Sequence, residues 1–159
     1  KEHVRKDFDC GKPALDDFLE RHARQNDTKG IGRTFVALEP GDSRVYGYLT
    51  IRNGSIEFED LPPEEKRKLP RYDVPVVHIA RLAVDRRAAG QGLGKILLVE
   101  ALGIALEVSE SIGVRAVEVI AKDEESRSFY RKFGFQSLEE DELHLYLPLE
   151  TARLALRKQ

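Results

Sequence analysis

Residues 76–108, which read VVHIARLAVDRRAAGQGLGKILLVEALGIALEV, decide the fold. The run from Val76 to Val84 is almost continuously apolar, which is typical of a strand that is buried on both faces of a sheet. Glycines follow at alternate positions, Gly90, Gly92 and Gly94, and after them comes a strongly apolar stretch long enough for a helix. This order predicts a strand, a glycine-rich turn and a helix that covers the sheet.

The segment from Val114 to Ala121 is expected to be the strand that completes this unit. Gly113, just before it, is expected to end the preceding helix as a C-cap. Because a helical crossover joins the two strands, we expect them to lie parallel to each other. The sequence thus predicts a βαβ unit at the centre of the sheet.

The residues before this unit predict one helix and three strands. Apolar side chains recur at helical spacing from Pro13 to Asn26. Arg33 to Leu38 and Val45 to Arg52 read as an antiparallel hairpin. The pair Asn53-Gly54 is a typical hairpin turn, so a third antiparallel strand is expected at Ser55 to Phe58.

The remaining elements are shorter. Leu61 to Leu69 reads as a short surface helix or loop. Asp123 is a good N-cap for a short helix that reaches about Lys132, and Gly134 is expected to stop it. Leucines alternate with polar-tipped residues from Leu143 to Leu147, which predicts a final, half-buried strand. The fold class is therefore α/β (α+β), with a mixed and mostly antiparallel sheet.

Size and composition fit one folded domain. The chain has 159 residues, is 41% hydrophobic and carries a formal net charge of -2, which argues against disorder. It contains no internal repeat or linker, so we expect a single domain over residues 1–159. A sequence pI near 6.1 leaves only local patches to bind nucleic acid.

Cysteine usage and hydropathy restrict the compartment and the ligands. The single cysteine, Cys10, excludes an internal disulfide, and no cluster of Cys and His has the spacing of a metal site. No apolar run approaches the roughly 18 residues that span a bilayer, and no signal-peptide core follows the charged start. We expect a cytoplasmic protein without a metal or a membrane partner.

The strand, glycine-rich turn and helix together predict an anion site. N–H groups of a first helical turn point outward, and glycines let a phosphate approach the backbone. A Walker loop would need glycine and then Ser or Thr where the chain has Ala89 and Ile96. A dinucleotide fingerprint would need a third glycine where Lys95 stands. A phosphate-bearing ligand of another kind is expected.

The turn resembles the pyrophosphate loop of the GNAT superfamily of acyl-CoA N-acetyltransferases, in which Gln or Arg is followed by two residues, Gly, one residue, and Gly or Ala. Two registers fit. Aligned by the following helix, Gly92 and Gly94 are the motif glycines and Ala89 replaces the Gln or Arg. Aligned by the basic residue, Arg87, Gly90 and Gly92 match. We prefer the first register because the start of the helix fixes it.

A second landmark, Phe129 to Phe135, resembles the late-helix signature of the same family. The resemblance implies that Tyr130 lies by the sulfur of coenzyme A and protonates the departing thiolate. A phenol has an ordinary pKa near ~10, so proton exchange with an alkyl thiolate is nearly balanced, and such an acid typically contributes about 10² to 10⁴ in rate. The alternative role for Tyr130 is packing between Phe129 and Phe133. Asp123 and Ser126 depart from the family's usual Asn and Ala.

A third match, Arg81 to Asp85, resembles the strand whose backbone pairs with the pantetheine arm, which requires a splay between the two central parallel strands. The resemblance also implies helices on both faces of the sheet. Together these matches imply acetyl-CoA as co-substrate and direct attack by a primary amine on the thioester. The positions expected to bind the co-substrate are Leu82, Ala83, Val84, Arg87, Ala89, Gly90, Gln91, Gly92, Leu93, Gly94 and Lys95, with side-chain charge also available from Arg86.

The N-terminal stretch Phe8-Asp9-Cys10-Gly11 and the segment Arg33 to Val36 narrow the resemblance. They are similar to the branch that includes toxins which acetylate aminoacyl-tRNA and are held by a ribbon-helix-helix antitoxin. That branch also holds proteins without this role, and the acidic balance of the chain does not favour RNA. The acceptor amine and the oligomeric state, a homodimer included, stay open. The alternative function is a non-catalytic module that binds coenzyme A or regulates a partner.

Other reactive side chains have weaker patterns. His78 and His144 fall in predicted strands, where histidines are more often structural than catalytic. Cys10 precedes a helix, which lowers a thiol pKa in some proteins, but no histidine is placed beside it in the sequence. The group that deprotonates the amine is not marked by any motif, and water or Glu118 could serve.

Overall fold

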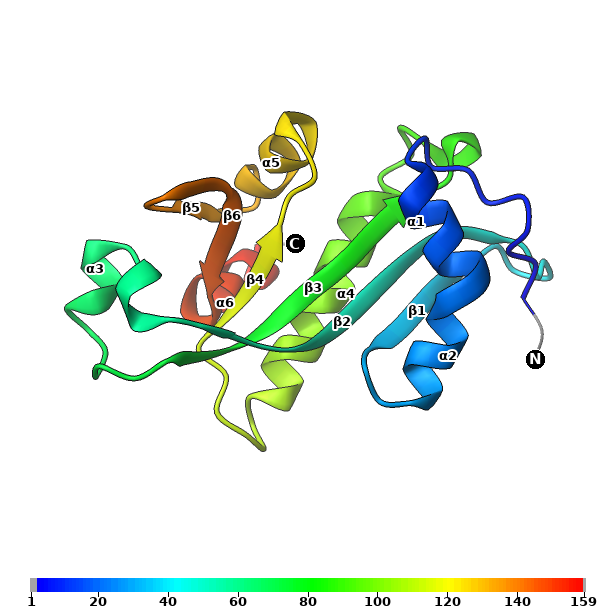
Figure 1. Cartoon of the computed structure of the whole chain (residues 1–159). Coiled ribbons are helices and arrows are strands. Elements are labelled where there is room, and N and C mark those ends of the chain that lie inside the picture. The colour runs from blue at the N-terminus through cyan, green and yellow to red at the C-terminus, as the bar shows by residue number, and fades with distance from the viewer. Residues whose placement is uncertain (1–2, 159) are drawn as a thin grey trace. The chain divides into compact units, whose positions relative to one another are not determined.

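The structure of the protein is a computed structural model, and it describes residues 3–158. Figure 1 shows how the helices and strands are arranged. In chain order they are α1 (Pro13–Asp17), the π-helix η1 (Phe18–His22), α2 (Ala23–Thr28), β1 (Arg33–Leu38), β2 (Val45–Ile56), η2 (Phe58–Asp60), α3 (Pro63–Lys66), β3 (Val74–Val84), η3 (Arg86–Ala88), α4 (Leu93–Val108), β4 (Ala116–Ile120), α5 (Glu124–Arg131), β5 (Gln136–Leu138), β6 (Asp141–Pro148) and α6 (Leu149–Arg157).

The strands form one mixed sheet in the order β1-β2-β3-β4-β6-β5. β3 and β4 are parallel, with Val76 opposite Ala116 and Ile79 opposite Val119. The pairs β1–β2, β4–β6 and β5–β6 are antiparallel. The predicted parallel pair within a mostly antiparallel sheet is therefore confirmed.

The chain divides into two compact units, each with its own apolar core. The first holds the residues up to Arg52 together with Ala80–Ala101, and the second holds Asn53–Ile79 and the residues from Leu102 onward. β2, β3 and α4 each contribute to both units. The core of the first unit contains Phe8, Leu15, Phe18, Leu19, Ala23, Val45, Tyr48 and Ala83. The core of the second contains Ile56, Leu61, Val74, Val76, Ala116, Leu138 and Tyr146.

The predicted N-terminal helix is present and contains a π-helical turn. α1, η1 and α2 follow one another without a break from Pro13 to Thr28, and the N–H of Ala23 donates to the carbonyl of Phe18, five residues earlier. Phe18 and Leu19 are buried inside this turn. π-turns are rare and frequently lie at functional sites.

The hairpin predicted at Asn53-Gly54 is wrong. β2 continues without a turn from Val45 to Ile56, so two strands rather than three precede the central unit. A Cβ atom at Gly54 would lie 3.1 Å from the Cβ of His78 and 3.3 Å from Oε1 of Glu118. Glycine is present because neighbouring side chains approach the strand closely, not because the chain reverses.

Two further expectations need correction. α4 ends at Val108 rather than at Gly113, because N–H groups of the following turn, Ser111 and Ile112 among them, already donate to the carbonyl of Val108. The last strand, predicted to be half-buried, is buried on both faces from Leu145 to Leu147, where Tyr146 is only 1% exposed. Its ring packs in the core of the second unit, a role that the alternating pattern did not indicate.

Other elements agree with the sequence or add to it. Asp123 caps α5 by accepting a hydrogen bond from the N–H of Ser126 at 2.9 Å, and Gly134 ends the turn after it with φ +96°. β5 and α6 were not foreseen. Within residues 3–158, no helix combines the length and hydropathy needed to cross a membrane.

Candidate functional site

The turn after β3 is an exposed loop that leads into the first turn of α4. Gly90 and Gly92 both have left-handed backbone, with φ of +76° and +81°. A Cβ at either position would meet nothing within 4 Å, so glycine is required here by conformation and the outer side of the loop is open. The first bond of the helix runs from the N–H of Ile96 to the carbonyl of Gly92 at 3.2 Å. The N–H groups of residues 93–95 precede it and lie at the positive end of the helix dipole.

Asp85 anchors the base of this loop. Its side chain is 1% exposed and accepts hydrogen bonds from the N–H, Nε and Nη2 of Arg87 at 2.8, 2.9 and 2.9 Å. It also accepts one from the N–H of Asp9 at 3.0 Å. The Arg87 guanidinium, which outweighs the effect of burial, holds the pKa of Asp85 well below its usual range. Asp85 is therefore a fully bonded carboxylate that fixes where the loop begins.

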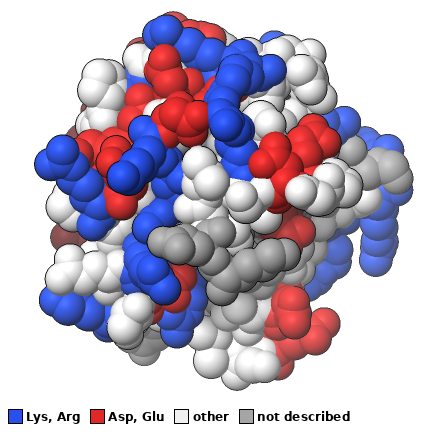
Figure 2. Space-filling view, turned by 90° about the vertical axis from the view of Figure 1, so that its right-hand side faces the viewer, with Lys and Arg blue, Asp and Glu red and all other residues white. Residues whose placement is uncertain are grey.

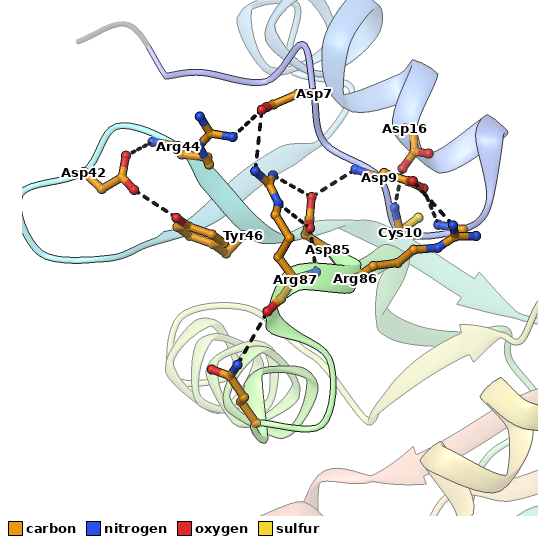
Figure 3. Close-up of polar contacts among 12 residues, drawn as sticks. Asp7, Asp9, Cys10, Asp16, Asp42, Arg44, Tyr46, Asp85, Arg86 and Arg87 are labelled. Carbon is orange, nitrogen blue, oxygen red and sulfur yellow. Dashed lines mark hydrogen bonds and ion pairs between the residues drawn. The ribbon is translucent and has the colours of Figure 1, made fainter.

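The two arginines expected to face phosphate are already engaged with acids. Besides Asp85, Arg87 lies 3.5 Å from Oδ2 of Asp7 and stacks on the ring of Tyr46, 5.5 Å from its centroid. Arg86 lies 3.6 Å from Oδ2 of Asp9. Figure 3 shows both guanidinium groups directed toward the N-terminal segment. In this structure Arg86 and Arg87 hold the loop to the N-terminal segment.

The N-terminal segment is bonded to the loop through backbone as well. The N–H of Arg86 donates to the carbonyl of Asp9 at 2.9 Å, and Oδ1 of Asp9 accepts from the N–H of Gly11 at 2.9 Å (Figure 3). Cys10 lies between Asp9 and Gly11 in the sequence. Burial raises the pKa of its thiol to about 11, with Asp16 adding to the effect, so Cys10 is not an activated nucleophile.

The strand end that precedes the loop is packed tightly. Ala83 is 5% exposed in the core of the first unit, while Leu82 and Val84 are half-buried. A Cβ at Gly47 of β2 would lie 3.2 Å from the carbonyl oxygen of Ala83 and 3.0 Å from Cδ2 of Leu93. Glycine at position 47 thus lets the first turn of α4 lie close against the strands that hold the loop.

Among the other predicted loop residues, Ala89, Gln91 and Lys95 are exposed. The side chain of Gln91 donates from Nε2 to the carbonyl of Arg87 at 3.5 Å. The structure thus brings the loop residues together within the first unit.

Tyr130 lies in the second unit, on α5, and is 5% exposed. Its ring makes edge-to-face contacts with Phe129 and Phe135, with centroids 5.1 and 5.4 Å away. Burial raises the pKa of the phenol above its ordinary value of 10. The side chain therefore stays protonated at neutral pH.

A buried cluster joins three residues that the sequence showed only singly. Glu118 on β4 is 6% exposed and contacts Nδ1 of His78 at 2.7 Å and Nε2 of His144 at 2.5 Å. Burial opposes ionisation of Glu118, but the two histidine hydrogen bonds outweigh it and lower its pKa to about 2. The bond to Glu118 raises the pKa of His144. An ionised Glu118 only accepts hydrogen bonds, so both contacting ring nitrogens carry hydrogen.

This cluster was missed because its members lie on three different strands. A carboxylate with a pKa of about 2 is also a poor proton acceptor at neutral pH, which weakens the suggestion that Glu118 is the base. The described residues, 3–158, contain no group of three or more His, Cys, Asp or Glu placed to hold a metal ion.

The fold, the loop and the late helix together define an acyltransferase of the GNAT type. The profile of the family described as "Acetyltransferase (GNAT) family" matches residues 2–135. The chain belongs to this family.

Two relatives are similar over most of their length. One is a tRNA-acetylating toxin of Mycobacterium tuberculosis, 41% identical over 146 residues, which covers 92% of this chain and 86% of the relative. The other is a probable toxin TacT of Sinorhizobium fredii, 30% identical over 159 residues, which covers 95% of this chain and 88% of the relative.

Solved structures show the same fold. AtaT complexed with acetyl-methionyl-tRNAfMet has a TM-score of 0.89 at 30% identity and covers 97% of this chain and 92% of that one. AtaTR bound with acetyl-CoA has a TM-score of 0.84 at 31% identity, with coverage of 97% and 91%. A tyrosine-to-phenylalanine variant of KacT has a TM-score of 0.90 at 29% identity, with coverage of 96% and 91%.

Proposed function

We propose that this protein transfers the acetyl group of acetyl-CoA to the α-amino group of an aminoacyl-tRNA. A relative at 41% identity is named for tRNA acetylation, and the similar AtaT was solved with an acetylated methionyl-tRNA. The related AtaTR was solved with acetyl-CoA. The reaction is direct attack of the amine on the thioester carbonyl, which forms the amide bond and releases the thiol of coenzyme A.

The observation that carries the proposal is the open, left-handed glycine loop ahead of α4. Gly90 and Gly92 turn the backbone into the first turn of α4, and the space beside both glycines is open, which fits a pyrophosphate. α4 begins at Leu93, which supports the register in which Gly92 and Gly94 are the motif glycines. Lys95, exposed in the first turn, is the basic side chain that this register offers to the phosphates.

The backbone of residues 82–84 on β3 is proposed to bind the pantetheine arm as an added strand would. Tyr130 is proposed as the acid that protonates the thiolate. Membership of the family supports this role, whereas burial raises the pKa of the phenol and so makes the side chain a weaker acid than an alkyl thiol. Its contacts with Phe129 and Phe135 hold the ring in one orientation, which packing alone would also do.

The same relatives suggest the partner and the setting. AtaT was solved with the C-terminus of the antitoxin AtaR, and KacTA was solved with DNA. We infer that an antitoxin of the ribbon-helix-helix type holds this protein inactive in the cytoplasm. Whether a small gene for such a protein lies beside this one is a direct check.

Turnover with defined acceptors tests the function. Purified protein is incubated with acetyl-CoA and a panel of aminoacyl-tRNAs, and thiol release and acetyl-aminoacyl-tRNA are measured. Tyr130→Phe should lower kcat at least about tenfold while acetyl-CoA binding persists, because only the proton donor is removed. The control is Tyr72→Phe, at a tyrosine that is 74% exposed, which should leave kcat unchanged.

Unchanged turnover in the Tyr130 variant removes Tyr130 from the acid role. Acetyl-CoA binding without thiol release on any aminoacyl-tRNA favours the non-catalytic module instead. Thiol release on small amines alone keeps the acetyltransferase and rejects the tRNA acceptor.

A further inference from the structure

The surface of the first unit is hollowed beside the N-terminal segment and the first helices. Two hollows of about 410 and 520 Å³ share Arg5, Glu20 and Arg21 among their lining residues. Arg24 and Lys29 line one of them. The cations that line the two, here called the basic hollow, are Arg5, Lys6, Arg21, Arg24 and Lys29.

The charge of the basic hollow is opposite to that of the chain. The whole sequence has 26 basic and 28 acidic residues, whereas the lining of the hollow has five cations against one acid, Glu20. Figure 2, which faces the side of the molecule at the right of Figure 1, shows Lys and Arg side chains gathered in groups beside acidic ones. A local excess of this kind concentrates anions even on an acidic protein.

Part of this charge is not neutralised by the protein. Arg21 pairs with Asp17 at 3.0 Å, and the nearby Asp27 is taken by Arg33 at 2.7 Å. Among residues 3–158, Arg24 and Lys29 have no acidic side chain within 4 Å, and both are exposed. These two positive charges are therefore available to a partner.

The helix orders these groups along one face. Arg21, Arg24, Gln25 and Thr28 follow the spacing i, i+3, i+4 and i+7, so two cations and two neutral hydrogen-bonding side chains lie along this face. At 1.5 Å per residue, Arg21 and Lys29 are separated by about 12 Å along the axis.

The π-turn helps to build the floor of the hollow. Arg5 lines both hollows and is half-buried, and its Nη1 donates to the carbonyl of Leu19 at 3.2 Å. Leu19 lies within η1, so a carbonyl of this rare turn holds one of the cations.

We propose that the basic hollow binds the phosphodiester backbone of the acceptor tRNA. This inference rests on the proposed function and adds the surface that receives the RNA. Several cations on one surface, two of them without an acidic partner, match a chain of phosphates, whose affinity for a protein comes largely from neutralised charge. An acidic peptide is the other polyanion that this charge would attract, and the binding test below distinguishes it from RNA.

The test compares two doubly substituted proteins of equal net charge. One carries Arg24→Ala with Lys29→Ala, and the control carries Arg153→Ala with Lys158→Ala, at exposed cations around α6. At about 100 mM salt, the first should raise KM for aminoacyl-tRNA about fivefold or more and leave kcat within about twofold. The slope of log KM against log salt should fall by about 1.5 to 2, because two phosphate contacts are lost. The control should change neither.

Binding of deacylated tRNA by fluorescence anisotropy separates this inference from the proposed function. If the wild type acetylates no aminoacyl-tRNA but binds tRNA through Arg24 and Lys29, the proposed function is rejected and the proposed tRNA-binding surface is supported. Equal tRNA affinity in the variant and the wild type overturns the inference. Loss of binding to a labelled polyglutamate peptide, with tRNA binding unchanged, also overturns it and identifies an acidic-peptide site.

Discussion

Asp85 in the first unit and Glu118 in the second are both buried, ionised carboxylates, but they obtain their partners differently. Asp85 takes three of its hydrogen bonds from Arg87, only two residues away. Glu118 takes its bonds from His78 and His144, which are 40 and 26 residues away. The first carboxylate shapes a loop at the end of one strand, whereas the second ties three strands together. We therefore expect Asp85 to matter most for ligand binding and Glu118 most for the stability of the fold.

Glu118→Gln should give the largest loss of stability. The amide cannot accept a charge-assisted bond from each imidazole, and one of its own donors would face a ring N–H. We expect the free energy of unfolding to fall by about 3 kcal/mol, measured by urea denaturation at pH 7. Glu110→Gln, at an exposed glutamate, is the control and should be neutral. Loss of acetyl-CoA affinity in the folded Glu118 variant would show that Glu118 also supports ligand binding, and would contradict the distinction between the two carboxylates.

Asp85→Asn should have a smaller effect on stability and a larger one on binding. The amide nitrogen would face either the guanidinium of Arg87 or the N–H of Asp9, so the loop loses its anchor. We expect about 2 kcal/mol less stability and at least tenfold weaker acetyl-CoA binding by calorimetry. Asp73→Asn, at an exposed aspartate, is the matched control. Unchanged affinity would show that the carboxylate supports the fold alone.

The pH dependence of stability should show the smallest effect. Because the pKa of Glu118 falls from 4.5 to about 2 on folding, its contribution is present above about pH 4.5 and is lost as the pH falls toward 2. The pKa of His144 is raised, so its contribution is complete below about pH 6.5 and is lost as the pH rises. Thermal melts from pH 3 to 8.5 should show both losses in the wild type. In the Glu118→Gln variant, the melting temperature should change less with pH at both the acidic and the basic end. A variant whose melting temperature follows the same pH dependence as the wild type would contradict this account.

The sequence predicted the elements whose signals are local. The apolar run of β3, the glycine turn and the cap at Asp123 depend on neighbours within a few residues, and each is confirmed. The hairpin predicted at Asn53-Gly54 is wrong because the glycine is needed for the close approach of His78, which is distant in the chain. The C-cap predicted at Gly113 is wrong because N–H groups of the preceding turn already donate to the last carbonyl of α4, that of Val108.

The candidate site also combines residues with a local sequence signal and contacts that only the fold brings about. The spacing of Asp85 and Arg87 is a local signal that could have been recognised, whereas their bonds to Asp7 and Asp9 depend on the fold. The cluster around Glu118 required three strands to be aligned in register. The roles of Tyr130 and of the loop in binding acetyl-CoA stay predictions, although family membership is confirmed.

The hydrogen bonds between Asp9 and the loop limit how far the N-terminal segment can be shortened. The backbone of Asp9 donates to Asp85 and accepts from Arg86, and both bonds lie upstream of the first helix. Proteolytic trimming of the first ten residues would leave every named strand and helix in the sequence, but it would remove both of these bonds together with Phe8, which packs in the core of the first unit. A trimmed protein should therefore be less stable, and where it still folds it should bind acetyl-CoA more weakly.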